Sequence, residues 1–282
     1  MVQFVWRSLT IAGIIILLTG LILGIIGEVD RIRRIIWGVE AEVKFYNYNL
    51  EGYLADEVTD VIITYANHNI QYPLRATINE KTGAIIPETK GKIIDITATV
   101  DKILNARQAE KIRAVDYQII PDLKKGDLIS SQDELAKYET RILGSKNRKN
   151  NIRLAAELIN NTLLVSGEIF SFNREVGPRT EERGFKESPQ IVEGRLTLGV
   201  GGGICQVSST LYNAVVKQNL NIIEHHHHSQ EVGYVPQGQD AAVAWRYLDF
   251  RFKNNLAKPL IIKAKVNGEQ LEVRLLGNKD HI

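Results

Sequence analysis

Three patterns of apolar and polar positions follow one another along the chain. An uncharged run covers residues 8–27, short periodic segments cover 41–126, and longer ones cover 127–282. We therefore predict an α+β fold in three parts: a membrane anchor with a juxtamembrane helix at 1–40, a small α+β module at 41–126, and a larger mixed domain at 127–282. In the larger domain we expect a helix packed on an antiparallel sheet.

The uncharged run, SLTIAGIIILLTGLILGIIG, is about as long as a helix needs to cross the hydrocarbon core of a membrane. A cleaved signal peptide is the alternative, but its apolar core is shorter and ends in an A-x-A-like site. No such site stands near Gly27, which favours an anchor that crosses the membrane through residues 8–27. The segment 28–40 is either an amphipathic helix or an extension of the anchor helix.

The module at 41–126 alternates predicted strands and helices. Strands are expected at 42–49, 72–79, 83–91 and 113–123, and helices at 56–66 and 94–106. Asp56 is placed to cap the first helix, and Asp95 or Thr97 to cap the second. The module has no cluster of titratable residues, so no site is expected there.

The larger domain begins with a predicted connector and helix. Ser131 and Glu134 have the spacing of a capping box, which predicts a short helix within 126–146. A second helix is predicted at 151–164. Its apolar stripe consists of Ile152, Ala156, Ile159 and Leu163. After a strand or turn with inward-facing Phe170 and Phe172, residues 176–199 are rich in Gly, Pro and charge and predict a long loop.

The C-terminal segments predict strands at 248–252, 259–266 and 269–276. Asn267 and Gly268 predict a two-residue hairpin turn between the last two strands. Strand alternation then supplies one buried face, made of Ile262, Ala264, Val266, Leu271, Val273 and Leu275.

The stretch GVGGGICQVSSTLYNAVV holds the single cysteine, Cys205, directly after three glycines. A helix is predicted to follow, since Val207, Leu211, Ala214 and Val215 share one face. Free N–H groups and the helix dipole at that helix start favour a thiolate, which is the nucleophilic form of cysteine. The alternative is a small buried side chain after a flexible turn.

The segment EHHHHS follows the cysteine by about twenty residues and supplies a candidate base. If it is a strand, His226 and His228 share one face and His225 and His227 the other. Asp240, after the strand-like EVGYVPQG, is a candidate to orient the imidazole, with Glu224 as the alternative. This order of Cys, His and acid is used by papain-like and transglutaminase-like enzymes. A solvated polar loop is the competing interpretation.

Other residues near the cysteine are candidates for binding substrate. Main-chain N–H groups from Gly202 and Gly203 to Gln206 are candidates to hold an oxyanion. Arg179 in the predicted loop is a candidate partner for a substrate carboxylate, although the acidic residues around it make a solvated surface the safer interpretation. Tyr234, in the strand-like segment, completes the candidate binding residues.

Composition narrows the possible functions. The 35 basic residues nearly balance the 33 acidic ones, which does not suggest a nucleic-acid partner. One cysteine allows no internal disulfide. Neither a Walker-type loop nor a complete G-x-G-x-x-G occurs. A zinc site of Cys205 and histidines is an alternative that lacks the spaced ligand pairs of structural sites, so we expect no metal and no cofactor.

The chain from about Glu139 to Asn278 resembles the VanW domain of bacterial cell-envelope proteins. The resemblance lies in NIRLAAELINNTLLVSGEIFSFN, VGPRTEERGFKESPQIVEG, GGGICQVSSTLYNAVV, EHHHHSQEVGYVPQGQDAAVAW and LDFRFKNNLAKPLIIKA. The family's histidine motif usually reads like ERHxHS, which maps onto His226 and His228. His225 stands where an arginine is common.

The resemblance implies work on peptidoglycan, and some VanW-domain proteins are regarded as L,D-transpeptidases that use this cysteine. It makes stem peptides the expected partner, in transfer or in hydrolysis. The alternative is an envelope protein that binds peptidoglycan or glycopeptide without chemistry and is linked to glycopeptide resistance. Residues 79–104 also resemble the peptidoglycan-binding module that often precedes VanW domains, although a spacer with no binding role fits nearly as well.

The sequence gives two conflicting indications of the membrane orientation. Arg7 precedes the uncharged run, whereas Arg31, Arg33 and Arg34 follow it, so a count of basic residues places the large domain in the cytoplasm. The resemblance implies an exported domain. We expect a single-pass protein of the cell membrane with the C-terminal domain outside the cytoplasm.

Overall fold

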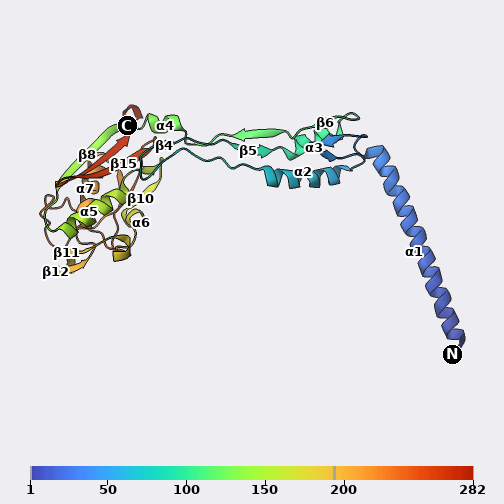
Figure 1. The fold of residues 1–282 in the computed structure, drawn as a ribbon, viewed down its shortest axis with the longest axis horizontal. Coiled ribbons are helices and arrows are strands. Elements are labelled where there is room, and N and C mark those ends of the chain that lie inside the picture. The colour runs from blue at the N-terminus through green and yellow to red at the C-terminus, as the bar shows by residue number, and fades with distance from the viewer. Residues whose placement is uncertain (1, 193–194, 282) are drawn as a thin grey trace. The chain divides into compact units, whose positions relative to one another are not determined.

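The computed structural model describes residues 2–192 and 195–281 and has the predicted mixed α+β composition (Figure 1). Its contacts divide the chain into two compact units. Unit 1 comprises Met1–Leu74 and Lys90–Ile120, and unit 2 comprises Arg75–Thr89 and Pro121–Ile282. The three-part division with boundaries at residues 40 and 126 stays a prediction.

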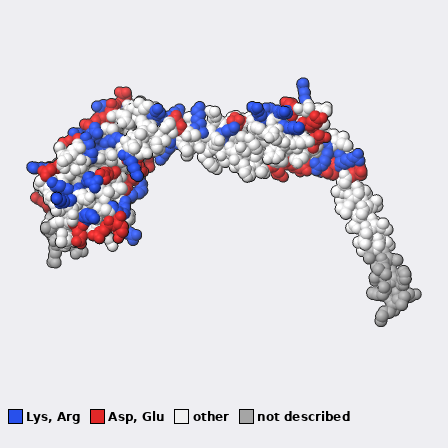
Figure 2. Space-filling view, in the orientation of Figure 1, with Lys and Arg blue, Asp and Glu red and all other residues white. Residues whose placement is uncertain are grey.

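Helix α1 runs from Val2 to Trp37 without a break, so the segment after residue 27 extends the first helix. The stretch Gly13–Trp37 is long and apolar enough to cross a membrane, and a signal sequence would meet the same criterion. In Figure 2 the described part of this helix carries no Lys, Arg, Asp or Glu until the turns that adjoin the rest of unit 1.

The end of α1 is held by Arg34. Its guanidinium donates to both carboxylate oxygens of Glu57 at 2.7 and 2.8 Å, and also to Asp30 at 2.8 Å. Glu57 lies in the first turn of α2 (Ala55–Asn69) and also accepts from the N–H of Leu54, the N-cap residue. The predicted cap at Asp56 is therefore wrong, because the N-cap residue is Leu54, two residues earlier, and its amide donates to Glu57.

The remainder of unit 1 is two small sheets and one more helix. One sheet has the order β2 (Tyr48–Asn49), β1 (Lys44–Phe45), β6 (Lys111–Ile112), and the other pairs β5 (Gly91–Ile94) with β7 (Asp116–Ile119). Helix α3 (Ile96–Leu104) is capped by Asp95, as one of the two predictions had it. Its Val100 and Ile103 pack with α2 and β1 side chains in an apolar core.

Unit 2 is built on a four-stranded antiparallel sheet with the order β8 (Asp133–Arg141), β16 (Gln270–Gly277), β15 (Leu260–Asn267), β9 (Thr162–Leu164). The predicted buried face of β15 and β16 is confirmed, although Val266 is only partly buried. Asn267 pairs with Gln270, so the turn consists of Gly268 and Glu269, one residue later than predicted. Gly268 has the positive φ (59°) that a primed turn requires.

Strand β8 replaces the short helix predicted from Ser131 and Glu134. Residues 133–141 pair with β16 along their whole length, and this edge pairing outweighs the local capping signal. Ser131 instead donates to the carbonyl of Asp127 at the end of a preceding helix, α4 (Lys125–Ile129). The hairpin of β3 (Thr77–Ile78) and β4 (Ile85–Ile86) also belongs to unit 2.

Helices α5 (Lys146–Ile159) and α7 (Ile204–Lys217) pack against this sheet and against each other (Figure 1). Helix α5 starts earlier than predicted, because Ser145 caps it. It ends at Ile159, so Leu163 belongs to β9 and not to the helix stripe. The predicted apolar face of α7 is confirmed: Val207, Leu211, Ala214 and Val215 are fully buried.

A second antiparallel sheet has the order β10 (Ile169–Ser171), β14 (Arg251–Lys253), β13 (Asn221–Glu224). Short helices α6 (Phe172–Val176), η1 (Glu181–Arg183) and η2 (Lys279–His281) complete the unit. The loop predicted at 176–199 is wrong in part, since it contains the hairpin β11 (Glu187–Val192) and β12 (Arg195–Val200). These two strands pair only with each other, so no larger sheet imposes an apolar alternation on them.

Candidate active site

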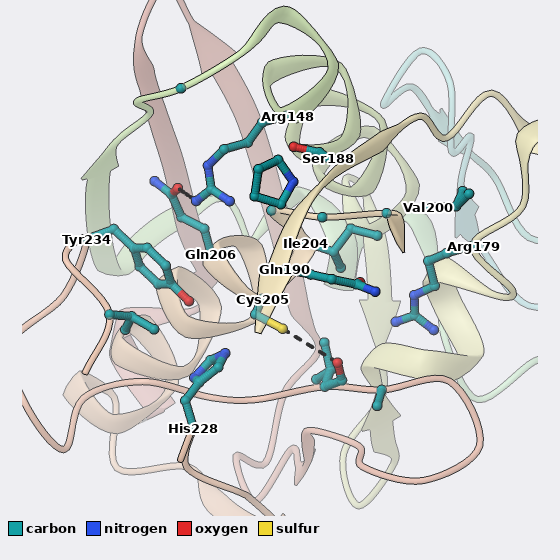
Figure 3. Close-up of a pocket in the computed structure, with 18 of the residues that line it drawn as sticks. Arg148, Arg179, Ser188, Gln190, Val200, Ile204, Cys205, Gln206, His228 and Tyr234 are labelled. Atoms are coloured by element: carbon teal, nitrogen blue, oxygen red, sulfur yellow. Dashed lines mark hydrogen bonds between the residues drawn. The ribbon is translucent and has the colours of Figure 1, made fainter. Parts of the chain in front are cut away.

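A pocket of about 780 Å³ opens in unit 2 around Cys205. Figure 3 shows the thiol near its centre, with Arg148, Gln206 and Tyr234 on one side, Arg179 on the other, and His228 facing the sulfur. The walls come from the loop before α5, the β11–β12 hairpin, the glycine loop and the segments around residues 228–234 and 243–245. Segments far apart in the sequence therefore meet at one thiol.

The glycine loop delivers Cys205 to the second position of α7. Gly203 is the N-cap residue, with a φ of 105° that side chains rarely adopt. A Cβ at Gly202 would collide with the carbonyl oxygens of Ser188 and Pro189 in β11. The absence of side chains thus lets the loop lie directly against the hairpin, which places the cysteine at a helix start inside the pocket.

The thiol of Cys205 is half-buried and its sulfur lies 3.5 Å from the carbonyl oxygen of Val243. Burial is the largest influence and raises its pKa, but the neighbouring His228 ring, the Val243 carbonyl and the guanidinium of Arg179 together bring the pKa below its ordinary value. For His228, burial lowers the pKa, while Cys205 and Asp240 together raise it above its ordinary value. Both directions favour a thiolate and imidazolium pair.

Asp240 orients the imidazole. Its Oδ2 accepts hydrogen bonds from the Nδ1 of His228 at 2.6 Å and from the backbone N–H of His228 at 2.7 Å. Burial raises the carboxyl pKa, but these bonds and one from His227 hold the pKa at about 2. With Nδ1 engaged, Nε2 is the nitrogen of His228 that remains for the thiol.

The four histidines have different positions. His227 donates to Asp240 Oδ1 at 2.9 Å, and His225 donates to the backbone carbonyl of Asp240 at 2.7 Å while its ring stacks on Tyr212. The ring of His226 points away from the thiol, with its Nε2 3.1 Å from Glu224 Oε1, and it does not line the pocket.

Of the two interpretations of EHHHHS, the strand is wrong. Strand β13 ends at Glu224, so strand alternation does not govern the four rings, and His226 and His228 do not share a face toward the thiol. The strand-like segment EVGYVPQG is also irregular.

Polar residues on α7 hold the Asp240 segment, and sequence reasoning missed them. Ser208 Oγ donates to the carbonyl of Ala241 at 2.7 Å, Ser209 Oγ accepts from the Ala241 N–H at 2.8 Å, and Asn213 donates to the carbonyl of Gln239 at 2.7 Å. All three side chains are buried. Their signal in the sequence is a polar stripe on the helix that starts at the cysteine, opposite its apolar face.

The amides of the glycine loop narrow the choice of oxyanion donors. Those of Gly201, Gly202, Ile204 and Gln206 donate to backbone carbonyls, whereas those of Gly203 and Cys205 donate to no acceptor among the described residues. The Gln206 side chain is engaged elsewhere: its Nε2 donates to Thr140 and to the Arg141 carbonyl, and its Oε1 accepts from Arg148. Gln206 therefore anchors the helix start to β8.

Tyr234 and two arginines line the pocket beside the thiol. Burial is the largest influence on Tyr234, and with the charge of Cys205 it raises the phenol pKa, so this side chain keeps its proton at neutral pH. The Arg148 guanidinium lies 5.9 Å from the Tyr234 ring centre. Sequence analysis did not select Arg148, because nothing in the polar start of α5 distinguishes it from its neighbours.

Among the described residues, no group of three or more His, Cys, Asp and Glu side chains has an arrangement that would hold a metal ion. The zinc alternative therefore has no ligand set in the described part of the chain. The histidines around Asp240 use ring nitrogens to donate to its oxygens, so those nitrogens are not available as ligands.

Comparisons with known proteins agree with this region. A family described as "VanW like protein" matches residues 147–276. The uncharacterized protein YoaR of Bacillus subtilis (strain 168) is 40% identical over 209 residues, which cover 72% of this chain and 68% of YoaR.

The vancomycin B-type resistance protein VanW of Enterococcus faecalis (strain ATCC 700802 / V583) is 30% identical over 115 residues, which cover 39% of this chain and 42% of that protein. No solved structure matches the chain. The matched region contains the cysteine, the histidines and Asp240, and the chain belongs to the VanW-like protein family.

Proposed function

We propose that this protein is a membrane-anchored enzyme of the cell envelope that transfers acyl groups between peptidoglycan stem peptides, as an L,D-transpeptidase does. The observation that carries the proposal is the connected series Cys205, His228 and Asp240. A thiol at a helix start faces an imidazole whose other nitrogen donates to a buried carboxylate at 2.6 Å. This is the arrangement that activates a cysteine nucleophile.

In the proposed reaction the Cys205 thiolate attacks a peptide carbonyl of the donor stem. The N–H groups of Gly203 and Cys205, which have no other acceptor among the described residues, hold the oxyanion. The imidazolium of His228 gives its proton to the leaving amine, and a thioester on Cys205 results. An amine of a second stem then attacks the thioester and returns a proton to His228. If water attacks instead, the same site is a peptidase.

The cellular setting of the proposal comes from helix α1 and from the relatives. Gly13–Trp37 has the length and composition of a single membrane span. One relative is named a vancomycin B-type resistance protein, and the resemblance to VanW domains implies work on peptidoglycan. We place unit 2 outside the cytoplasm, where its substrate would be.

That relative's name also favours a second function. A protein that binds stem peptides or glycopeptide without chemistry would equally account for a link to resistance, and its pocket would need shape and charge but no nucleophile.

Intact-mass spectrometry of the full-length protein in detergent, incubated with tetrapeptide-stem muropeptides, separates the two functions. The transferase predicts a thioester adduct on Cys205 and dimeric muropeptides, both missing with Cys205→Ala. If the thiol reacts with iodoacetamide but neither adduct nor new product forms, the transferase proposal fails. Retention of the muropeptide or of vancomycin on the folded Cys205→Ala protein would then support binding.

A further inference from the structure

Arg179 is held in the pocket wall by packing and by two aromatic rings. It lies between α6 and η1, and its stem packs on the glycine loop, where a Cβ at Gly201 would approach Arg179 Cβ to 3.0 Å. Its guanidinium lies between two aromatic rings, 5.9 Å from the centre of Phe172 and 5.7 Å from that of Trp245. The rings fix its place without using its hydrogen-bond donors.

The two terminal nitrogens of Arg179 are buried and have no hydrogen-bond partner among the described residues. Burial, the largest influence, lowers the pKa to about 10, so the side chain is still charged at neutral pH. A buried charge without a partner is costly, and the cost is recovered when an anion binds. Because these two nitrogens have no existing hydrogen bond to break, an anion that binds to Arg179 displaces no partner of them.

Two other arginines in this region are already engaged. Arg183 Nη1 donates to the carbonyls of Val176 and Pro178 at 2.6 Å, and Arg148 donates to Gln206 at 2.8 Å and to the Leu143 carbonyl at 3.0 Å.

The carboxylate nearest in sequence to Trp245 is also engaged. Asp249 accepts from Ser171 at 2.5 Å and from the Asn173 N–H at 2.8 Å, and no salt bridge joins it to Arg179 among the described residues. Arg179 is therefore the pocket arginine whose terminal nitrogens are wholly uncommitted.

We propose that Arg179 binds the free carboxylate of the donor's terminal residue, the residue that leaves when Cys205 is acylated. This inference rests on the proposed function and names the feature of the substrate that the site selects. A guanidinium fork matches a carboxylate with two parallel hydrogen bonds. Figure 3 places Arg179 on the opposite side of Cys205 from Arg148 and Tyr234, which leaves that second side for the remainder of the peptide.

The chemistry follows from this placement. The Cys205 thiolate attacks the carbonyl carbon of the last amide bond, a C–S bond forms, and the C–N bond breaks. The leaving nitrogen takes a proton from His228 and departs as a free amino acid, whose carboxylate was held by Arg179. Cleavage is thereby limited to the last bond of a donor with a free carboxyl end, and a donor ending in a carboxamide is a poor substrate.

The test compares two tetrapeptide stems that differ only in a terminal carboxylate or carboxamide. The rate of thioester formation on Cys205 is measured by intact mass with the full-length protein. We expect the carboxylate donor to react about 10- to 100-fold faster, the range of a charge-assisted pair. Arg179→Gln should bring the ratio of the two rates to about one. Arg179→Lys, which keeps the charge without the planar guanidinium, should keep part of the preference for the carboxylate donor.

Arg174→Gln is the matched control. Arg174 lies in the same part of the chain and carries the same charge, but it is exposed, donates to Glu175 and to the Ile169 carbonyl, and does not line the pocket. The ratio of the rates with the carboxylate and carboxamide donors should be the same for Arg174→Gln as for the unmodified protein. Because both donors meet the same thiol, the ratio is independent of any change in thiol reactivity caused by the lost charge.

The outcomes separate this inference from the function on which it rests. If neither donor forms a thioester, the transferase proposal fails. If both donors react equally, or if folded Arg179→Gln keeps the ratio, transfer stands and the assignment of Arg179 is overturned. Should Arg179→Gln not fold, calorimetry with folded Cys205→Ala decides the question: equal affinity for the two peptides overturns the assignment, and tighter binding of the carboxylate supports it.

Discussion

The two units bury different kinds of side chain. The core of unit 1 is apolar, built from residues such as Phe45, Ile62 and Ile103, and the one buried polar residue described there is Thr99. Unit 2 has a larger apolar core but also buries many polar side chains. Several gather around α7: Thr140, Asn151, Ser188, Gln206, Ser208, Ser209, Thr210, Asn213 and Asp240.

Buried polar groups stabilise a fold only when each is satisfied, so they demand exact placement of their partners. In unit 2 these partners fix the cysteine helix to β8 and to the Asp240 segment. The described core of unit 1 is held by apolar packing, whereas unit 2 also places costly polar interactions where they position a thiol, an imidazole and a carboxylate.

The largest effect should come from the thiol. Cys205→Ala is expected to lower acyl transfer by at least about 10³-fold, because no other nucleophile replaces the sulfur. Its melting temperature should change little, since the side chain is half-buried and has few polar contacts. Transfer is followed by muropeptide chromatography and unfolding by calorimetry. Substantial residual transfer would contradict the role of this residue in unit 2.

Substitutions of His228 and His226 test which histidine of unit 2 is the base. His228→Ala is expected to lower transfer by about 10²- to 10⁴-fold, as for loss of a general base. His226→Ala is the matched control and should cost less than about tenfold, because its ring turns to Glu224. The alkylation rate of Cys205 by iodoacetamide at pH 7 gives a second measurement. A larger loss with His226→Ala would reverse the assignment of the base.

A pair of core substitutions compares how the two cores affect the thiol. Ile62→Ala in unit 1 and Leu211→Ala in unit 2 both remove fully buried helix side chains, and each should cost about 2–5 kcal/mol of unfolding free energy. Only Leu211→Ala should alter the alkylation rate of the folded protein, since α7 carries Cys205. Urea unfolding and alkylation measure the two effects. An equal change in the alkylation rate from Ile62→Ala would contradict the view that only the core of unit 2 positions the thiol.

The smallest effect concerns acid stability. The folded-state pKa of Asp240 is about 2, below its ordinary value, so its stabilisation is present at pH 5 and is lost as the pH falls through that value. The unmodified protein should lose about 2 kcal/mol more than Asp240→Asn between pH 5 and pH 2. Urea unfolding at both pH values measures the difference. Parallel loss in both proteins would show that the carboxylate contributes no linked stability.

Local patterns predicted several elements well. The apolar face of α7, the paired faces of β15 and β16 and the cap at Asp95 all depend on residues within one element or one hairpin. The errors lie where a distant partner overrules the local signal. Strand β8 formed where a capping box predicted a helix, because β16 offered an edge that the local sequence does not reveal.

The candidate active site also has features that local patterns predict and features that they do not. Local sequence patterns place one cysteine after a glycine loop at the start of an amphipathic helix, with histidines and Asp240 after it, because glycine tolerance and helical periodicity are local properties. The three-dimensional packing brings His228 to the thiol, turns His226 away from it, and leaves Arg179 without a hydrogen-bond partner for its terminal nitrogens beside Phe172 and Trp245. Those relations join segments up to about 70 residues apart, and their geometry is set by packing against the sheet and α7, which no local pattern encodes.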